Sequence, residues 1–413
     1  MTIPTTSEIE AHLREIIRRT PIITIRLDII NKCNLRCIMC QYSDDKNFNR
    51  TVKHFTPEDF DKLFRDIAPY VNDVMLSCSD EPLTSKYFPE ILYMVANYPP
   101  LRKISLCTNA MLMSQRVSRL IIENGVTSIL LSMDGVTKST YERIRVGSKY
   151  ERVVGNIMML RDLKNASGSK YPAMIMNFVM MNANIHEAPL FVEMARLLGV
   201  ETVDFRHVVP TEYWHDEDGM LSSHKSKYNY YRERIIEASR QHKINVNLPP
   251  PYDISEQWKP GIDIPHVDLS DFYHVNGNQI TGEIPRSKVF PPDFASENIA
   301  GTIHKEFSNI FCHRPFTDIQ LVNDKIKCCP WLKTSLGSLN DGKSLFEIFT
   351  GEEYQRLRRN MYLTNGDPNC NGCIEKSDFF GLKKHKLKQN LFRSLSRKIK
   401  NRLRRAFYHV STM

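Results

Sequence analysis

The stretch Ile22-Ile23-Thr24-Ile25-Arg26-Leu27-Asp28-Ile29-Ile30 is followed almost directly by Cys33-Asn34-Leu35-Arg36-Cys37-Ile38-Met39-Cys40. The first part is apolar and rich in β-branched residues, which predicts a buried strand. The second part holds three cysteines in one short loop, and such spacings let a loop bind several corners of an iron–sulfur cube. With no fourth cysteine nearby, one iron stays free for a ligand that the protein does not supply.

Three closely spaced cysteines also fit a partial zinc site or a set of structural thiols. The cysteine loop, however, closely resembles the cluster loop of the radical SAM enzymes. The resemblance implies that Cys33, Cys37 and Cys40 hold a [4Fe–4S] cluster whose open iron is chelated by S-adenosyl-L-methionine (SAM). It also implies that reduction of this cluster cleaves SAM and gives a 5′-deoxyadenosyl radical.

Composition and charge limit the class of protein. The 413 residues are 41% hydrophobic and could form two or three domains, with no export signal and no apolar stretch long enough for a membrane span. Ten cysteines in clusters then favour metal binding in a reducing cytoplasm over disulfides. The net charge of +9 comes from the end of the chain, since residues before Leu382 include 45 basic and 47 acidic side chains.

After the cysteine loop, strand and helix patterns alternate. Thr56-Pro57-Glu58-Asp59 has the capping hydroxyl, early proline and acidic residues of a helix start. Together with the first strand, further apolar strands are predicted near residues 74–77, 104–107, 128–135, 173–181 and 202–206. Six strands alternating with helices predict an α/β fold with parallel pairing, and polar motifs at strand ends predict a site at that edge. By resemblance this is the partial (β/α)6 TIM-like barrel of radical SAM enzymes.

Several motifs match the family in order and spacing. Ser79-Asp80-Glu81-Pro82 replaces the usual Gly-Gly-Glu-Pro, and Thr108-Asn109-Ala110 replaces Thr-Asn-Gly, while Ser132-Met133-Asp134-Gly135 matches the motif of the fourth strand. Arg145 lies where relatives place an arginine that pairs with the SAM carboxylate, and Met39 lies where they have an aromatic residue at adenine. The resemblance therefore implies SAM contacts from Asp80, Glu81, Asn109, Ser132, Asp134 and Arg145. It assigns no catalytic residue beyond the cluster ligands.

A second cysteine set predicts a second cluster. Residues 319–327 alternate around an Asn-Asp turn, which predicts a hairpin that brings Cys312 close to Cys328 and Cys329. Cys370-Asn371-Gly372-Cys373 adds two thiols from a tight loop. The region resembles the SPASM or twitch domain, which implies one auxiliary [4Fe–4S] cluster held by Cys312, Cys328 or Cys329, Cys370 and Cys373. A four-cysteine zinc ribbon is the alternative, and spacing slightly favours Cys329 over Cys328.

The remaining segments have plainer interpretations. Ser7-Glu8-Ile9-Glu10 predicts a capping box in the N-terminal extension, 1–20, which leaves no room for a leader-peptide domain before the barrel, 21–243. Residues 244–308 are rich in proline and form a linker or an irregular lid, and the open barrel mouth is one surface that their aromatic residues could cover. The SPASM/twitch-like domain spans 309–380.

The tail, 381–413, repeats an apolar residue every four positions among basic ones. This pattern predicts an amphipathic helix that contacts a membrane surface or a partner protein, or else a solubilising end. Basic charge also permits non-specific contact with RNA, but nothing predicts specific nucleic-acid binding.

Taken together, the motifs predict a radical SAM oxidoreductase that abstracts a hydrogen atom from its substrate. The preferred outcome is oxidation or epimerisation of a carbohydrate or aminoglycoside-type small molecule. The alternative is a maturase that modifies a ribosomal peptide or a protein side chain. Either enzyme needs an electron donor such as flavodoxin or ferredoxin. A different class would be a non-catalytic, zinc-stabilised scaffold that binds RNA or membrane through the tail.

Overall fold

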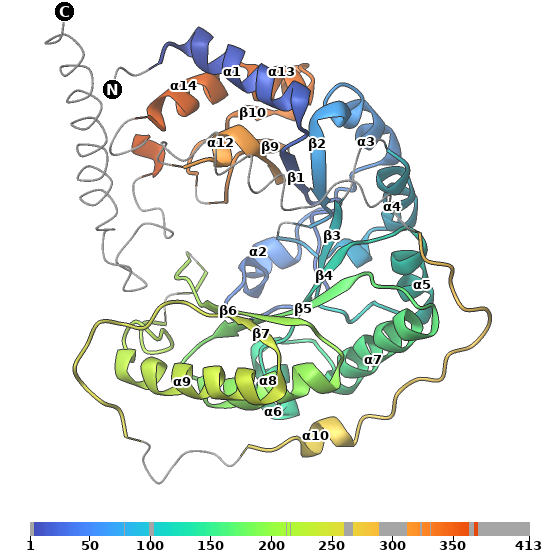
Figure 1. Ribbon diagram of the computed structural model, residues 1–413, viewed down its shortest axis with the longest axis vertical. Helices are drawn as coiled ribbons and strands as arrows, with labels where there is room; N and C mark the ends of the chain where they lie inside the picture. Colours follow the sequence, from blue (N-terminus) through green and yellow to red (C-terminus); the bar gives the residue numbers. More distant parts are fainter. Residues whose placement is uncertain are drawn as a thin grey trace, which may run out of the picture.

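The computed structural model describes most of the barrel and part of the C-terminal region (Figure 1). The described residues are 4–77, 79–98, 103–211, 213–214, 216–259, 267–288, 312–322, 324–330, 332–362 and 367–370. The predicted tail, 381–413, and Cys373 lie outside them. In the described part of the chain, no helix is long and apolar enough to cross a membrane.

One curved sheet of ten strands, in the order β10-β9-β8-β1-β2-β3-β4-β5-β6-β7, organises the structure. Seven consecutive strands are parallel: β1 Ile23–Leu27, β2 Val71–Met75, β3 Lys103–Thr108, β4 Ser128–Ser132, β5 Ala173–Met180, β6 Thr202–His207 and β7 Asn245–Asn247. The six predicted strands and the partial barrel are confirmed. The short β7 was not predicted, because Asn-Val-Asn lacks the apolar content of a strand.

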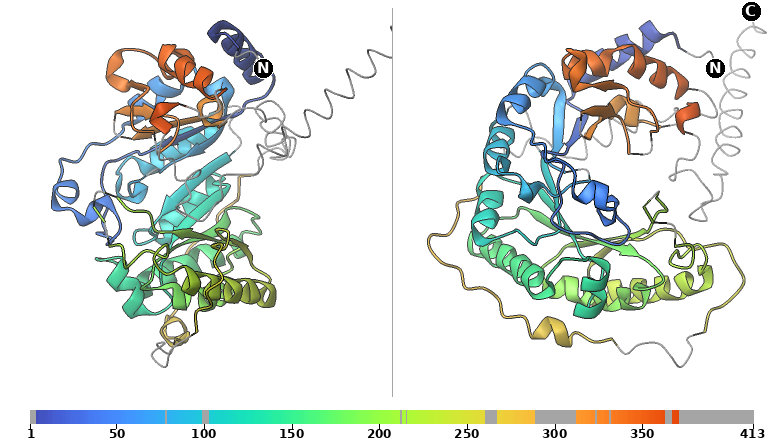
Figure 2. Two further views of the ribbon diagram at one scale, coloured as in Figure 1. Left: turned by 90° about the vertical axis from the view of Figure 1, so that its left-hand side faces the viewer. Right: turned by 180° about the vertical axis from the view of Figure 1, so that it is seen from behind.

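Helices cover the convex side of this sheet (Figures 1 and 2). They are α3 Pro57–Phe64, α4 Phe88–Asn97, α5 Gln115–Glu123, α7 Tyr150–Ala166, α8 Ala188–Leu197 and α9 Lys225–His242. Alternate strand residues such as Met174, Met176 and Phe178 point into this core and are fully buried. The residues between them are half-buried and face the concave side. The short helices α2 Asp45–Phe48 and α6 Lys138–Ile144 lie in loops that follow strand ends.

The C-terminal region continues the barrel sheet. It contains α12 Arg314–Thr317, β8 Asp318–Val322, β9 Lys325–Lys327, β10 Gly337–Ser338, α13 Leu345–Thr350 and α14 Glu352–Asn360. β8 pairs in parallel with β1, and the predicted hairpin of β8 and β9 is confirmed. An ion pair of 2.9 Å between Arg26 Nη1 and Asp318 Oδ1 joins the two parts. This pairing fixes the C-terminal unit at the first edge of the barrel.

The N-terminal helix α1, Thr6–Arg19, lies against α14 (Figure 1). Its capping box is formed by Thr5 and Glu8, so the predicted box at Ser7 and Glu10 is wrong. Both pairs satisfy the sequence pattern. With Thr5 as the cap, the apolar residues Ile9, Leu13 and Ile16 are buried, which explains why the helix starts before the predicted cap at Ser7.

After β7, the described part of 244–308 follows the outside of the barrel (Figure 1). Trp258 stacks edge-on against Tyr230 of α9, with ring centroids 4.9 Å apart. α10, Ser270–Tyr273, provides Asp271, which accepts a hydrogen bond of 2.7 Å from the Lys138 backbone N–H. Farther along, Thr281 bonds to Gln115 of α5. These described residues therefore cover outer helices and not the barrel mouth.

Candidate active site

The three cysteines of the loop after β1 lie at the carboxyl end of the sheet. The loop is held by backbone bonds from the N–H groups of Arg36 and Ile38 to the carbonyls of Val146 and Ile144. Cys37 is buried, and Cys33 and Cys40 are half-buried. The Leu35 N–H points at the Cys33 sulfur at 3.4 Å. All three thiols therefore sit in one sheltered loop whose N–H groups can support thiolates.

Burial disfavours free thiolates in this loop. It raises the pKa of Cys37 to about 11, although the neighbouring Arg145 cation acts in the opposite direction. Burial also raises the pKa of Cys33, and the nearby Glu81 carboxylate raises it further. Within the described residues, no three His, Cys, Asp or Glu side chains are gathered as the ligands of a single metal ion. The loop offers three thiols, and a cluster distributes its thiolate ligands over several irons.

Glu81 ties the end of β2 to the end of β3. Its carboxylate accepts hydrogen bonds from the Thr108 hydroxyl and the Asn109 backbone N–H, each at 2.7 Å. Asn109 Nδ2 then lies 3.8 Å from the Cys33 sulfur. Burial raises the pKa of Glu81 to about 7. The geometry brings the predicted residues Glu81 and Asn109 directly beside the cysteine loop.

Ala110, which replaces the glycine of the motif that it resembles, has a left-handed backbone conformation. Its φ of 58° is in the left-handed region, where glycine is normally preferred. Asn156 Nδ2 donates a hydrogen bond of 2.7 Å to the Ala110 carbonyl. The loop therefore keeps its shape without the family's glycine, at the expense of local strain.

Asp28, which directly follows β1, shapes the loop that replaces the family's glycines. Its carboxylate accepts hydrogen bonds from the Ser79 N–H (3.0 Å), the Ser79 hydroxyl (2.9 Å) and the Asp80 N–H (3.2 Å). Sequence reasoning missed this role. The only signal was an acidic residue within an apolar strand pattern.

Asp80 turns toward the far end of the cysteine loop. Its Oδ1 accepts a hydrogen bond of 2.6 Å from the Tyr42 hydroxyl. The same oxygen forms an ion pair of 3.1 Å with Arg50. Burial and the neighbouring Asp28 raise the pKa of Asp80 to about 7. Tyr42 and Arg50 were not predicted as site residues. They anchor Asp80, and Tyr42 lies two residues beyond Cys40.

Arg145 and Asp134 form a buried ion pair. Arg145 Nη1 also lies 3.8 Å from the Cys37 sulfur, and Asp134 Oδ1 accepts a bond of 2.7 Å from the Val179 N–H. Ser132 lies beside Cys107, with 3.9 Å between oxygen and sulfur. Arg145 and Asp134 were both predicted to contact SAM, but their partnership with each other was not predicted.

Polar side chains cross the concave face of the sheet. Strand register places Ser132 of β4 beside Asn177 of β5, and Asn177 beside Asp204 of β6. Arg206, two residues further along β6, is exposed and donates from Nε to Asp204 Oδ2 at 2.8 Å. Sequence reasoning missed Asn177, Asp204 and Arg206, although the alternation of polar and apolar residues in both strands was the available signal.

A small apolar cluster borders the same end of the barrel. Met39 packs with Met181, Val208, Trp214 and Met220, which follow β5 and β6. This cluster is separate from the main core. Met39 therefore has the apolar surroundings expected for its predicted place at adenine.

The C-terminal cysteines also come together. Cys328 is buried and hydrogen-bonds to Cys329, and this bond is the largest factor that raises its pKa, followed by burial. Its electrostatic neighbours include Cys312 and Cys370, which arrive from before β8 and after α14. The structure thus gathers four of the five predicted C-terminal cysteines, while Cys373 lies outside the described residues.

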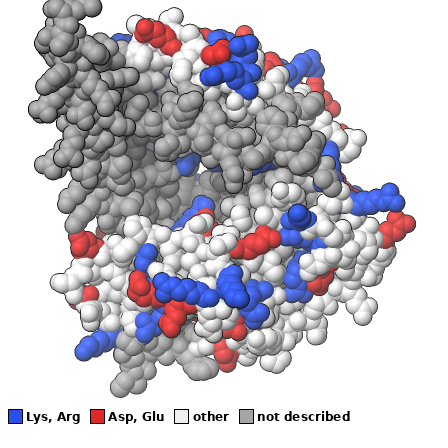
Figure 3. Space-filling view, in the orientation of Figure 1, with Lys and Arg blue, Asp and Glu red and all other residues white. Residues whose placement is uncertain are grey.

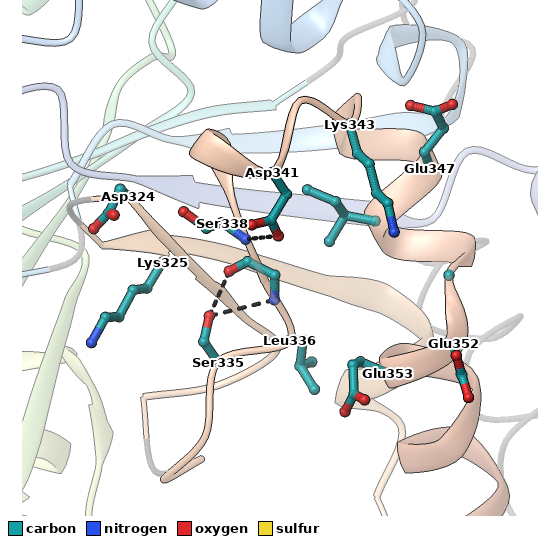
Figure 4. Close-up of a pocket in the computed structure, with 13 residues that line it drawn as sticks. Asp324, Lys325, Ser335, Leu336, Ser338, Asp341, Lys343, Glu347, Glu352 and Glu353 are labelled. Atoms are coloured by element: carbon teal, nitrogen blue, oxygen red, sulfur yellow. Dashed lines mark hydrogen bonds between the residues drawn. The ribbon is translucent and has the colours of Figure 1, made fainter.

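A polar pocket in the C-terminal unit has none of these cysteines in its lining (Figure 4). Its lining includes Asp324, Lys325, Asp341, Lys343 and Glu347. In the orientation of Figure 3, acidic and basic side chains are interspersed on the visible described surface. The pocket contains none of the predicted site residues, so it is not part of the candidate active site.

The sequence of the barrel matches a known family. Residues 27–183 match the Radical SAM superfamily. A protein of Methanocaldococcus jannaschii described as "Probable GTP 3',8-cyclase" is 28% identical over 178 residues, which are 43% of this chain and 56% of that protein. This chain spans only about 38–56% of the length of the first curated relatives that it matches.

Two solved structures share the fold over most of the chain. Streptococcus suis SuiB bound to the precursor peptide SuiA has a TM-score of 0.56 at 13% identity, with 86% of this chain and 71% of SuiB covered. Native anSMEcpe with bound AdoMet and the Cp18Cys peptide has a TM-score of 0.53 at 15% identity, with 88% of each chain covered. At these identities the likeness establishes the fold.

Proposed function

Because residues 27–183 match the Radical SAM superfamily, we propose that the chain is an enzyme that cleaves SAM and abstracts a substrate hydrogen atom. The observation that carries this proposal is the sheltered loop of Cys33, Cys37 and Cys40 beside Glu81, Asn109 and Arg145. When bound, the family's [4Fe–4S] cluster supplies the electron that breaks a carbon–sulfur bond of SAM and gives a 5′-deoxyadenosyl radical. The chain's own residues bind and orient the reactants.

The three cysteines are the proposed cluster ligands, since their donor type and single loop fit three corners of a cube. N–H groups of Leu35, Asn109 and Arg145 point toward the cysteine sulfurs and would stabilise their charge. We assign Glu81 to the SAM ammonium group. Its carboxylate has lone-pair sites left beyond the bonds it accepts from the protein.

Arg145 and Asp134 would act as a unit at the SAM carboxylate. The ion pair holds the guanidinium in place, and a guanidinium has five N–H donors, so binding a second carboxylate need not break the first contact. Ser132 at the end of β4 is assigned to the ribose hydroxyls. Asp80 is assigned a supporting contact through its loop.

The C-terminal cysteines are the proposed ligands of one auxiliary [4Fe–4S] cluster. Cys312, the adjacent pair Cys328 and Cys329, and Cys370 come from three segments, and the other three are electrostatic neighbours of Cys328. With Cys373 they offer five thiols for four positions, so one of the adjacent pair is spare. Soft thiolates suit iron–sulfur clusters and zinc alike, and metal analysis distinguishes them.

For the substrate we propose a polar small molecule of the carbohydrate or aminoglycoside type. The polar row of Asn177, Asp204 and Arg206 on the concave face supports this, because paired carboxylate and guanidinium groups suit hydroxyl and amino groups. Modification of a peptide is the second candidate. It is supported by the fold shared with SuiB and anSMEcpe, both of which were solved with peptides.

The decisive experiment uses protein reconstituted anaerobically with iron and sulfide, then reduced with dithionite in the presence of SAM. We expect about eight irons per chain, as for two four-iron clusters, and formation of 5′-deoxyadenosine. A variant with Cys33, Cys37 and Cys40 changed to Ala should keep about four irons and lose cleavage. Zinc in place of iron, without cleavage, would favour the scaffold alternative.

Substrate class is tested by adding deuterated amino sugars or candidate peptides and measuring deuterium in 5′-deoxyadenosine. Asp204→Asn and Arg206→Gln should reduce substrate-dependent turnover and leave the slow cleavage without substrate unchanged. Arg240→Gln, on the outer helix α9, is the matched control. Deuterium transfer from peptides alone would reject the small-molecule assignment.

A further inference from the structure

Arg358, on α14, is a fully buried cation. The residue is 0% exposed, and its Nε donates a hydrogen bond of 2.9 Å to the Pro315 carbonyl. The guanidinium carbon lies 4.3 Å from the ring centroid of Phe349 and 5.0 Å from that of Tyr354. Its Nη1 and Nη2 atoms are buried, and neither has a hydrogen-bond acceptor among the described residues. The aromatic rings stabilise the charge but accept few of its hydrogen bonds.

A buried guanidinium without enough acceptors needs another explanation. Burial lowers the pKa of Arg358 to about 9, which shows how strongly its surroundings disfavour the cation. Charged arginine is nevertheless the rule in proteins, because its intrinsic pKa is so high. Native structures rarely leave buried donors unpaired, so a missing anion with acceptor atoms is expected at this position.

One C-terminal cysteine, Cys328, is an electrostatic neighbour of Arg358. Cys328 also interacts electrostatically with the other three described cysteines of the C-terminal unit, Cys312, Cys329 and Cys370. Tyr354, whose ring contacts the guanidinium, donates a hydrogen bond of 3.1 Å from its hydroxyl to the carbonyl of Lys327, the residue before Cys328. An iron–sulfur cluster held by four thiolates carries net negative charge, and its sulfur atoms accept hydrogen bonds.

We infer that Arg358 is the buried counter-charge of the auxiliary cluster and that its guanidinium sets how readily this cluster takes up one electron. This inference rests on the auxiliary cluster of the proposed function and adds a role to a residue outside the ligand set. Reduction adds one electron and therefore one negative charge to the cluster, with no bond formed or broken. A fixed cation at the cluster favours that reduced state, and hydrogen bonds to cluster sulfur act in the same direction.

The test uses full-length protein in which Cys33, Cys37 and Cys40 are changed to Ala, so that only the auxiliary cluster is bound. The readout is a redox titration followed by electron paramagnetic resonance. Arg358→Met should lower the equilibrium constant for one-electron reduction of the cluster at least tenfold. This corresponds to a reduction potential about 59 mV more negative. Arg358→Lys, which keeps the charge, should recover at least half of that shift. Arg359→Met, the exposed neighbour on α14, should leave the potential unchanged.

Equal potentials in Arg358→Met and the parent protein would overturn the inference while leaving the auxiliary cluster intact. Failure of the parent protein to bind iron would instead overturn the proposed cluster, and this inference with it. If Arg358→Met fails to fold, a measurement on protein that keeps Arg358 still tests the inference. Reduced protein labelled with guanidino-15N arginine should show a weak 15N coupling to the cluster spin, which Arg358→Lys removes, and the lack of any coupling would reject the contact.

Discussion

Arg145 Nε lies 2.8 Å from Asp134 Oδ2, and the two side chains are only 8% and 0% exposed. An ion pair this deeply buried resists the loss of either partner, because the survivor is left as an unpaired charge. Asp134→Asn keeps the side-chain shape and the acceptor for the Val179 N–H but removes the charge. We expect it to lower the free energy of unfolding of the metal-free protein by about 3 kcal/mol. Urea unfolding at pH 7 measures this.

The same variant separates stability from binding. In cluster-loaded protein, Asp134→Asn should also weaken SAM binding, measured by anaerobic calorimetry, because Arg145 loses its orientation. Asp162→Asn, a half-buried partner of Arg161, is the control and should change neither quantity. Unchanged stability in Asp134→Asn would show that the pair is not formed in solution.

A substitution of Asp28, which is not one of the predicted SAM contacts, should change the affinity for SAM. Asp28→Ala removes the acceptor for the N–H groups of Ser79 and Asp80, so the loop before Glu81 loses its anchor. Hydrogen bonds to a charged group contribute about 1.5–3 kcal/mol each, and we expect SAM affinity to fall at least tenfold, or about 1.4 kcal/mol. Asp61→Ala on α3, where the carboxylate pairs with exposed Arg65, should leave the affinity unchanged.

The left-handed conformation of Ala110 predicts an order of stabilities. Ala110→Val should lower the free energy of unfolding by more than about 2 kcal/mol, since a β-branched side chain adds strain at positive φ. The free energy of unfolding of Ala110→Gly should stay within about 1 kcal/mol of that of the unsubstituted protein. Glycine relieves the backbone strain, and this gain offsets the loss of the buried methyl group and the greater flexibility of the unfolded chain. Denaturant unfolding compares the two, and a glycine variant less stable than the valine variant would contradict the assigned backbone.

His207 predicts acid sensitivity away from the metal sites. Its ring lies 4.6 Å from that of Tyr228, and burial lowers its pKa to about 4 from 6.5. Because the pKa of His207 is lower in the folded state than in the unfolded state, the folded state is favoured at pH values above 6.5. This contribution to stability is lost as the pH falls from 6.5 toward 4. Between pH 7 and pH 5 the loss should be about 2 kcal/mol. His207→Phe keeps the ring contacts and should remove that part of the pH dependence in metal-free protein; an identical dependence in both proteins would place the titration elsewhere.

The sequence predicted those features of the fold and the site that depend on a local pattern of residues. Alternating apolar residues located β4 and β5, and the Thr56 cap with Pro57 located the start of α3. The spacing of Cys33, Cys37 and Cys40 located the candidate site. Each of these signals lies within a few residues of the feature that it predicts, so a single chain is enough to read it.

Features that depend on distant segments were not predictable in this way. Asp28 meets Ser79 only because β1 and β2 end side by side, and no local pattern encodes that meeting. The capping box was misplaced for the same reason, since burial of Ile9 and Leu13 by the rest of the fold selected Thr5 as the cap. Arg145 and Asp134 were each found by motif, but their contact required the structure.

The parallel pairing of β1 with β8 has a consequence during synthesis of the chain. Arg26 leaves the ribosome 292 positions before its partner Asp318. At ordinary translation rates that interval lasts roughly 15–60 s. For that time one edge of β1 has no strand beside it, and an uncovered edge can pair with another chain. The nascent barrel therefore needs chaperone protection or prompt cover at this edge, and truncation before β8 would make the exposure permanent.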